Sequence, residues 1–197
     1  MPMIPIPAMC LFALGMSISP GPVNIVTMTS AVNSGARKTM LYVSGATIGF
    51  TLLLLFVGLF YVQLAHLLPV LVNYLRYVGA FYIFYMGFKI ITSKPTPLRH
   101  DDYKSPSFLS GFLTQCLNPK AWVAVISGIS AFTSSASYIP LFVFASLYFM
   151  ICYASIASWA VLGDKMAVLL NNDRQYRLFN WAMGGLLMAT AVYLLFL

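Results

Sequence analysis

The chain has 197 residues, of which 60% are hydrophobic and only 8% are charged, and this composition excludes a soluble globular domain. The formal net charge is +7, but the basic residues form short clusters between apolar stretches, as in membrane proteins rather than nucleic-acid-binding proteins. We therefore expect an integral membrane protein: one transmembrane domain over residues 1–197, surrounded by lipid, with no extramembrane domain and no nucleic-acid partner.

Six apolar segments follow one another, and each is long enough to cross a bilayer as a helix of about 20 residues. The first lacks the basic start and the cleavage site of a secretory signal, so we expect it to be retained as a span. The fourth and fifth are separate helices, because the polar residues 133–137 and then Pro140 supply a turn and a helix start. The segments cover residues 4–30, 40–64, 71–91, 108–132, 137–162 and 176–197.

The connections between these segments alternate in charge. The first contains Arg37 and Lys38, and the third and fifth also carry basic residues, whereas the second and fourth contain no Lys or Arg. Cytoplasmic loops of membrane proteins carry the excess of Lys and Arg. The odd connections are therefore expected in the cytoplasm, and both termini outside.

Three spans followed by three spans predict an inverted repeat, because a half with an odd number of spans makes the second half begin on the opposite side. Repeat 1 covers about residues 1–92, repeat 2 about residues 107–197, and a cytoplasmic linker about residues 93–106. The first helix of each half is interrupted, by SPGP at 19–22 and by LNPKAW at 117–122. The predicted fold is all-α, with six transmembrane helices in two inverted three-helix repeats and proline-broken first and fourth helices.

The proline interruptions expose backbone groups within the membrane. A helical proline leaves the carbonyl four residues earlier without its donor, which here frees the carbonyls of Met16, Ile18 and Gln115. Such groups are tolerated only where protein or a hydrated cavity covers them, so both breaks are expected to face the bundle interior. A simple proline kink is the alternative, and the corresponding positions of the two breaks in the two halves argue against it.

The second break also carries a lysine. Asn118 is a good N-cap and Pro119 suits the first helical position, so the two predict the start of a half-helix. Lys120 then lies near mid-span at the positive end of a helix dipole, which is unfavourable without an anion. The acidic residue nearest to a span is Asp164, at the end of the fifth segment, so we infer that a substrate carboxylate supplies the anion. Alternatively, Lys120 extends to the membrane interface or caps carbonyls of another helix.

A carboxylate at Lys120, with an ammonium group at the freed carbonyls of Met16 and Ile18 and the Asn24 amide, describes a small amino acid. No nucleophile pattern, phosphate loop or haem motif is visible, and His66 and His100 lack a third metal ligand. We therefore expect a secondary transporter, not an enzyme, with no cofactor and no metal. The predicted substrate-binding residues are Pro20, Gly21, Pro22, Asn24, Gln115, Asn118, Pro119 and Lys120.

Glycines predict close contacts between helices. Gly45 and Gly49 have the four-residue spacing that permits close approach, and Gly184 and Gly185 are expected to act similarly in the last helix. Such faces serve internal packing and a homo-oligomer interface equally well.

Five motifs in order along the chain, SPGPVNIV, SGARK, SGATIGF, VGAFYIFYMGFKI and GFLTQCLNPKAW, resemble the LysE-type amino-acid exporter family, including its homoserine and threonine exporter branch. The resemblance implies a six-helix exporter of amino acids or close derivatives in the bacterial inner membrane, driven by an ion gradient, with protons expected. Trp122 is similar to the cysteine and O-acetylserine exporter branch, whereas Val23 stands where many members have a polar residue. The family positions carried over are Pro20, Gly21, Pro22, Asn118, Pro119 and Lys120, with Gly45, Gly49 and Gly87 as structural companions.

Two other functions remain open. A membrane thiol–disulfide oxidoreductase would use Cys10 and Cys116, which lie in the first and fourth segments, although Cys10 precedes its proline by ten residues and Cys116 by three. A non-transporting assembly factor would have no cavity between the two breaks.

Overall fold

The computed structural model describes residues 4–93, 106–133, 137–170 and 172–196. The predicted linker lies almost entirely outside these residues, as do positions 134–136 of the polar turn before Pro140. The helices are α1 (Ile6–Ile18), α2 (Pro22–Ser34), α3 (Ala36–Leu59), α4 (Tyr61–Leu64), α5 (Leu68–Ile91), α6 (Phe108–Cys116), α7 (Pro119–Phe132), α8 (Ile139–Leu169) and α9 (Asp173–Phe196).

Among the described residues, α3, α8 and α9 are each long and apolar enough to cross a membrane. The pair α1 and α2 makes a fourth span if it is counted as one helix, bent by 56° at its break. Helix α5 is as long as α3, but Arg76 and several tyrosines dilute its apolar character, and the fourth segment is divided into the shorter helices α6 and α7. The chain is thus an all-helical, multi-pass membrane protein, and the full set of six spans stays a prediction.

The first predicted connection is reduced to one residue. Gly35 alone separates α2 from α3, and its φ of 85° lies in a region that side-chain-bearing residues rarely adopt. Arg37 and Lys38 therefore lie in the first turn of α3 rather than in a loop. The backbone N–H of Ala36 donates to Asp164 Oδ1 at 3.2 Å, so a carboxylate from α8 stabilises the positive end of α3.

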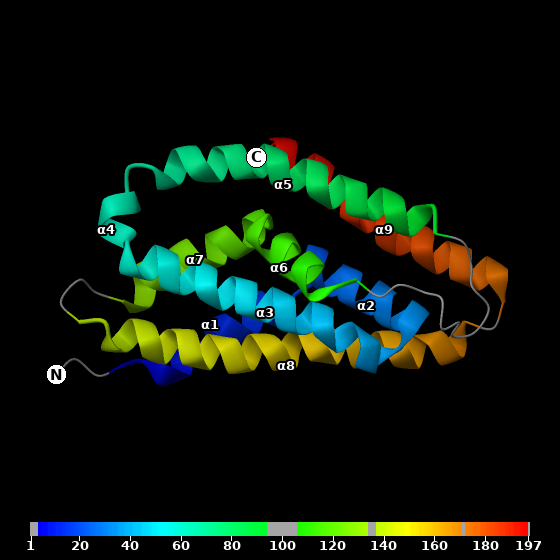
Figure 1. The fold of residues 1–197 in the computed structure, drawn as a ribbon, viewed down its shortest axis with the longest axis horizontal. Coiled ribbons are helices and arrows are strands. Elements are labelled where there is room, and N and C mark those ends of the chain that lie inside the picture. The colour runs from blue at the N-terminus through cyan, green and yellow to red at the C-terminus, as the bar shows by residue number, and fades with distance from the viewer. Residues whose placement is uncertain (1–3, 94–105, 134–136, 171, 197) are drawn as a thin grey trace.

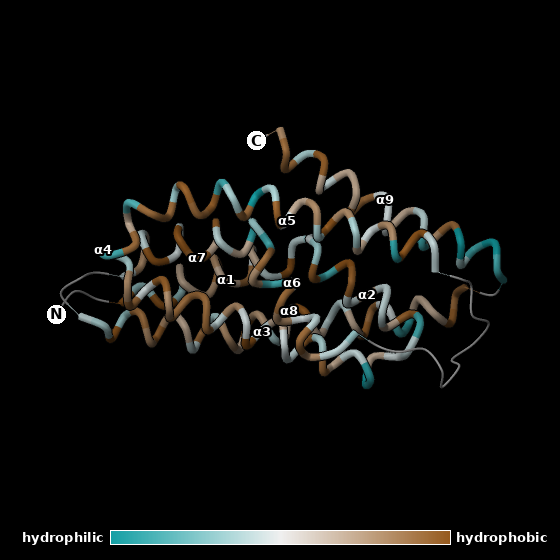
Figure 2. Tube along the Cα trace, turned by 45° about the horizontal axis from the view of Figure 1, so that its top comes forward, coloured by the Kyte–Doolittle hydropathy of each residue, from teal (hydrophilic) through white to brown (hydrophobic). Residues whose placement is uncertain are grey.

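The helices form an elongated bundle (Figure 1). Helices α5 and α9 pack together along one edge, and α3 and α8 pack together on the other side. The half-helices lie against this second pair: α6 packs on α3, and α1 and α2 pack on α8. The most hydrophilic stretches include α4 and the start of α9, at opposite ends of the long axis (Figure 2). We therefore expect the bundle to cross the membrane along this long axis.

Three of the predicted packing contacts bring backbones close together. A Cβ added at Gly45 would collide with the Phe108 carbonyl on α6. A Cβ at Gly87 would lie 2.7 Å from the Gly184 carbonyl oxygen, and one at Gly184 would lie 2.6 Å from the Gly87 carbonyl oxygen. The contact of α5 with α9 therefore depends on glycine at both positions.

The other two predicted packing glycines differ from each other. A Cβ at Gly49 would lie 3.2 Å from the Phe112 carbonyl oxygen, whereas one at Gly185 would meet no atom within 4 Å. Gly185 makes no such internal contact in the described part of the chain, because its neighbour Gly184 takes the face of α9 that meets α5. A role for Gly185 in a homo-oligomer interface stays a prediction. The sequence analysis also missed Gly163, where a Cβ would collide with the Met28 carbonyl of α2.

Helix α2 is enclosed by the rest of the bundle. Its residues from Pro22 to Asn33 are all buried, although several of them are polar. The side chains of Thr27, Thr29 and Asn33 donate to carbonyls four residues earlier in the same helix. These polar groups are satisfied without water, so α2 can lie in the bundle interior, where the sequence places a broken helix.

Candidate functional site

Each break ends one half-helix and begins another. Helix α2 begins at Pro22 after an extended Gly21, and α7 begins at Pro119 after an extended Asn118. The Asn118 side-chain oxygen accepts a hydrogen bond from the backbone N–H of Lys120 at 3.2 Å. The predicted N-cap and half-helix start in the second break are therefore confirmed.

Side chains satisfy the carbonyls that the first break frees. The Ser19 hydroxyl donates to the Met16 carbonyl at 3.3 Å, and Trp159 Nε1 donates to the Ile18 carbonyl at 3.1 Å. These two carbonyls already have donors, so the structure does not keep them free for an ammonium group, contrary to the prediction.

The Asn24 side-chain amide also makes hydrogen bonds within the protein. Its Nδ2 donates to the carbonyls of Ser17 at 2.8 Å and Ser19 at 2.9 Å, which ties α2 back to the end of α1. The second break has a similar tie, because Trp122 Nε1 donates to the Cys116 carbonyl at 2.8 Å. Both breaks are thus fixed by a side chain from the half-helix that follows.

Lys120 connects the two breaks. Its Nζ donates to the Ser19 carbonyl at 3.0 Å and lies 2.7 Å from Ser19 Oγ. The end of α1 and the start of α7 are therefore held together by one charged side chain. Of the arrangements that the sequence left open for Lys120, the structure shows the capping of carbonyls on another helix.

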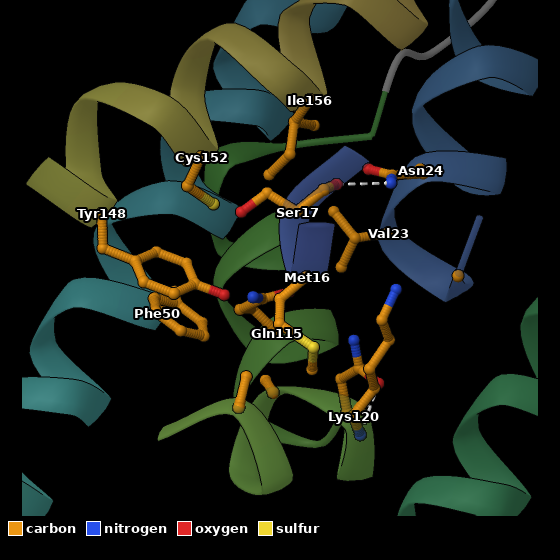
Figure 3. A pocket seen from close by; sticks show the side chains of 14 residues that line it. Met16, Ser17, Val23, Asn24, Phe50, Gln115, Lys120, Tyr148, Cys152 and Ile156 are labelled. Atoms are coloured by element: carbon orange, nitrogen blue, oxygen red, sulfur yellow. Dashed lines mark hydrogen bonds between the residues drawn. The ribbon is translucent and has the colours of Figure 1, made fainter. Parts of the chain in front are cut away.

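A cavity of about 30 Å³, the central cavity, lies between the two breaks (Figure 3). This volume holds about two water molecules, which is less than an amino acid needs. Of the predicted binding residues, Pro20, Pro22 and Pro119 shape the breaks without lining the cavity. Those that line it are Gly21, Asn24, Gln115, Asn118 and Lys120.

Side chains from α1, α3 and α8 complete the cavity wall. Phe50, Tyr148, Cys152 and Ile156 line it, together with Ser17 from α1. Figure 3 shows the Tyr148 hydroxyl pointing toward Gln115, and the Ser17 hydroxyl near the Cys152 sulfur. The sequence analysis missed these residues, because their apolar helices carry no interruption. Only Ser17, next to SPGP, had a signal nearby.

The central cavity has an uneven distribution of charge and of unpaired groups. The first turns of α2 and α7 and the Lys120 ammonium contribute positive charge, and none of the lining residues in the described part of the chain is acidic. Ser17 Oγ and Gln115 Oε1 are buried and have no hydrogen-bond partner among the described residues. The cavity therefore offers a cationic side for an anion and unpaired oxygens for a donor.

Two alternative functions can be compared with this geometry. An assembly factor was expected to have no cavity between the breaks, and the structure has one. Cys10, Cys116 and Cys152 are all free thiols. Cys152 lines the central cavity, whereas the proposed redox pair of Cys10 and Cys116 does not.

Comparison with known proteins identifies the family of this chain. The family model for LysE type translocators matches residues 14–197. Cysteine/O-acetylserine efflux proteins of Escherichia coli strain K12, Shigella flexneri serotype 5b and Shigella sonnei are each 31% identical over 121 residues. The aligned stretch covers 61% of this chain and 62% of each of these relatives, and no solved structure matches. The chain belongs to the LysE type translocator family.

Proposed function

We propose that this protein exports a small neutral amino acid or a close derivative from the bacterial cytoplasm, by alternating access of two inverted three-helix halves. The pairing of the helices supports two related halves. In the two halves, the broken pair α1 and α2 corresponds to the broken pair α6 and α7, α3 corresponds to α8, and α5 corresponds to α9. The packing of α6 on α3 then corresponds to the packing of α1 and α2 on α8. The pairs α3 with α8 and α5 with α9 map onto themselves.

The observation that carries the proposal is the contact of Lys120, which lines the central cavity, with Ser19 of the first break. A substrate carboxylate would replace Ser19 as the partner of Lys120, next to the N–H groups at the starts of α2 and α7. The substrate ammonium would donate to the unpaired oxygens of Ser17 and Gln115. This arrangement suits a zwitterion.

The cavity wall favours a small side chain. Phe50, Tyr148 and Ile156 bring bulky groups against the space between the breaks, and each of them is 2% exposed. Binding an amino acid requires the central cavity to widen, which links binding to movement of the two halves. Because the relatives are named for the efflux of cysteine and O-acetylserine, these two solutes are the first candidates.

The proposal includes protons as the coupling ion and the inner membrane as the location, with both termini outside. The basic residues of α3, α8 and α9 cluster at one end of the bundle, where Arg37, Lys165 and Arg174 lie near helix ends. An excess of basic residues at one end favours that end for the cytoplasm.

The experiment is transport by the purified protein in liposomes. Vesicles would be loaded in turn with labelled cysteine, O-acetylserine, serine, threonine and lysine, and efflux would be followed with and without an imposed pH gradient. We expect efflux of at least one small neutral member, faster with the gradient, and no efflux of lysine. Failure of every small neutral member would contradict the proposal. An efflux rate that is the same with and without the pH gradient would contradict only proton coupling.

A further inference from the structure

A second cavity lies at the end of the bundle opposite the basic helix ends. Its volume is about 340 Å³, within the range of small-molecule sites and much larger than the central cavity. It lies where α3 ends, α4 follows, α7 ends and α8 begins, all at the left of Figure 1.

The wall of the second cavity is half polar and half apolar and, in the described part of the chain, carries no charged side chain. Hydroxyl and amide groups of this kind can bind both ends of a zwitterion weakly without trapping either of them. The polar side chains are Tyr61, Gln63, Ser130, Thr133 and Tyr138.

Aromatic rings connect the two cavities. Phe50 stacks on Tyr148 at 4.2 Å between ring centroids in the wall of the central cavity, and Tyr148 meets Phe144 edge-on at 5.6 Å. Phe144 lies 5.2 Å from Phe132, which lies 5.6 Å from Phe12. We call these five rings the aromatic column.

The column reaches the second cavity along two helices. Phe132 adjoins Thr133 on α7, and Phe144 follows Leu141 by about one turn on α8, and both Thr133 and Leu141 line the second cavity. Phe144, at the middle of the column, is fully buried. Phe144 therefore joins Tyr148, which lines the central cavity, to Phe132, which precedes a residue of the second cavity's wall.

The Phe144 ring packs closely against the α7 backbone at Gly128. A Cβ at this position would lie 2.6 Å from Phe144 Cε1 and 2.7 Å from Cζ, so only glycine lets the ring rest against the α7 backbone. The Phe144 ring also contacts three neighbouring rings, those of Phe12, Phe132 and Tyr148. A ring held in this way is well placed to block a passage, and a change in its rotamer would open one.

We propose that the second cavity is an outer vestibule that binds the exported zwitterion after it leaves the central cavity, and that Phe144 with its aromatic column is the gate between them. This inference rests on the proposed export function and its orientation. In the closed state described here, the gate separates solute in the central cavity from the outer solution.

Cys152 provides a probe for the gate, because it lines the central cavity and is 2% exposed. Replacing Cys10 and Cys116 by Ser leaves Cys152 as the single thiol. Intact cells would be treated with a charged, membrane-impermeant methanethiosulfonate, and the rate of Cys152 modification measured in the parent and in Phe144→Ala and Phe144→Leu variants.

We expect modification to be about tenfold faster in Phe144→Ala, because the open state rises from a minor population. Phe144→Leu, which keeps more of the volume, should give a smaller increase. Phe56→Ala is the matched control, because Phe56 is 52% exposed and pairs with Phe60 outside the column. It should leave the rate unchanged.

The vestibule has its own probe, Ser130→Cys in a chain with all three native cysteines replaced by Ser. The reagent should modify the thiol of Ser130→Cys rapidly from outside, both in the chain that keeps Phe144 and in the Phe144 variants. Equal Cys152 rates in the parent and both Phe144 variants, or a Ser130→Cys thiol that is inaccessible from outside, would overturn the inference. Both results come from thiol labelling and not from the transport assay. Failure of the export proposal would be seen in the liposome assay, separately from failure of the gate.

Discussion

Lys120 Nζ lies 2.7 Å from the hydroxyl oxygen of Ser19 and 3.0 Å from its carbonyl oxygen, although the two residues are 101 positions apart in the chain. This contact joins the start of α7 to the end of α1. In the proposed mechanism a substrate carboxylate replaces Ser19 at Lys120, so binding weakens the connection between the two breaks. Ligand binding can shift a conformational equilibrium only through such a difference in contacts.

Lys120→Ala should abolish export while the protein remains in the membrane, because the substrate carboxylate loses its counter-charge. Lys120→Arg should retain partial export, since the guanidinium keeps the charge but not the compact shape of an ammonium group. The measurement is efflux from liposomes at equal protein content. Lys165→Ala, which removes an exposed charge from α8, is the control and should export normally. Full activity of Lys120→Ala would remove Lys120 from the mechanism.

Ser19→Ala should lower the substrate concentration needed for half-maximal export, because Lys120 loses one of its two oxygen partners and the substrate carboxylate competes more easily. A hydrogen bond to a charged group contributes roughly 1.5–3 kcal/mol, so we expect KM to decrease by about tenfold to about a hundredfold. Ser146→Ala, which removes an exposed hydroxyl bonded to the Phe142 carbonyl, is the matched control. An increase in KM would show that Ser19 binds substrate rather than competing with it.

Gln115→Leu should weaken substrate binding without destabilising the fold. Gln115 Oε1 is buried and unpaired, so its removal relieves a cost of about 1–3 kcal/mol in the empty protein. We expect KM to rise while the Tm of the purified protein stays the same or increases. A fall in Tm with unchanged KM would assign Gln115 to the fold instead of to the site.

Gly163→Ala should destabilise the protein by about 1–3 kcal/mol, because the added methyl group forces α8 away from the Met28 carbonyl of α2. Gly185→Ala is a matched control in α9, where the added Cβ meets no atom within 4 Å. It should instead stabilise the helix by about 0.5–1 kcal/mol. Thermal unfolding in detergent measures both, and equal Tm values for the two variants would contradict the packing described here.

The sequence predicted the parts of the site that lie in the breaks, because proline, asparagine and an unpaired lysine have local physical consequences. Asn118 and Pro119 are the residue types that favour a helix start, and the unfavourable position of Lys120 signalled a partner elsewhere. Neither observation could identify Ser19 as that partner. The pairing depends on how α1 meets α7, which local propensities do not determine.

The remaining site residues depend on the packing of distant helices. Tyr148 and Cys152 belong to α8, which carries no charged residue from Ile139 to Gly163. The donors for the freed carbonyls were also hidden, since Trp159 reaches Ile18 from another helix. The prediction for Met16 and Ile18 failed for this reason, because a carbonyl that is free in a broken helix can still be bonded in the folded bundle.

The proposed role of Lys120 is tested most directly by comparing a solute with its counterpart that lacks the carboxylate. Cysteine and cysteamine differ in this group. Each would be used as an unlabelled competitor of efflux in liposomes that contain either the unmodified protein or the Lys120→Gln variant, at matched protein content. If Lys120 binds the carboxylate, cysteine competes much better than cysteamine against the unmodified protein, and the difference disappears in residual transport or binding by Lys120→Gln. Equal competition by both compounds against the unmodified protein, or an undiminished preference for cysteine in Lys120→Gln, would contradict it.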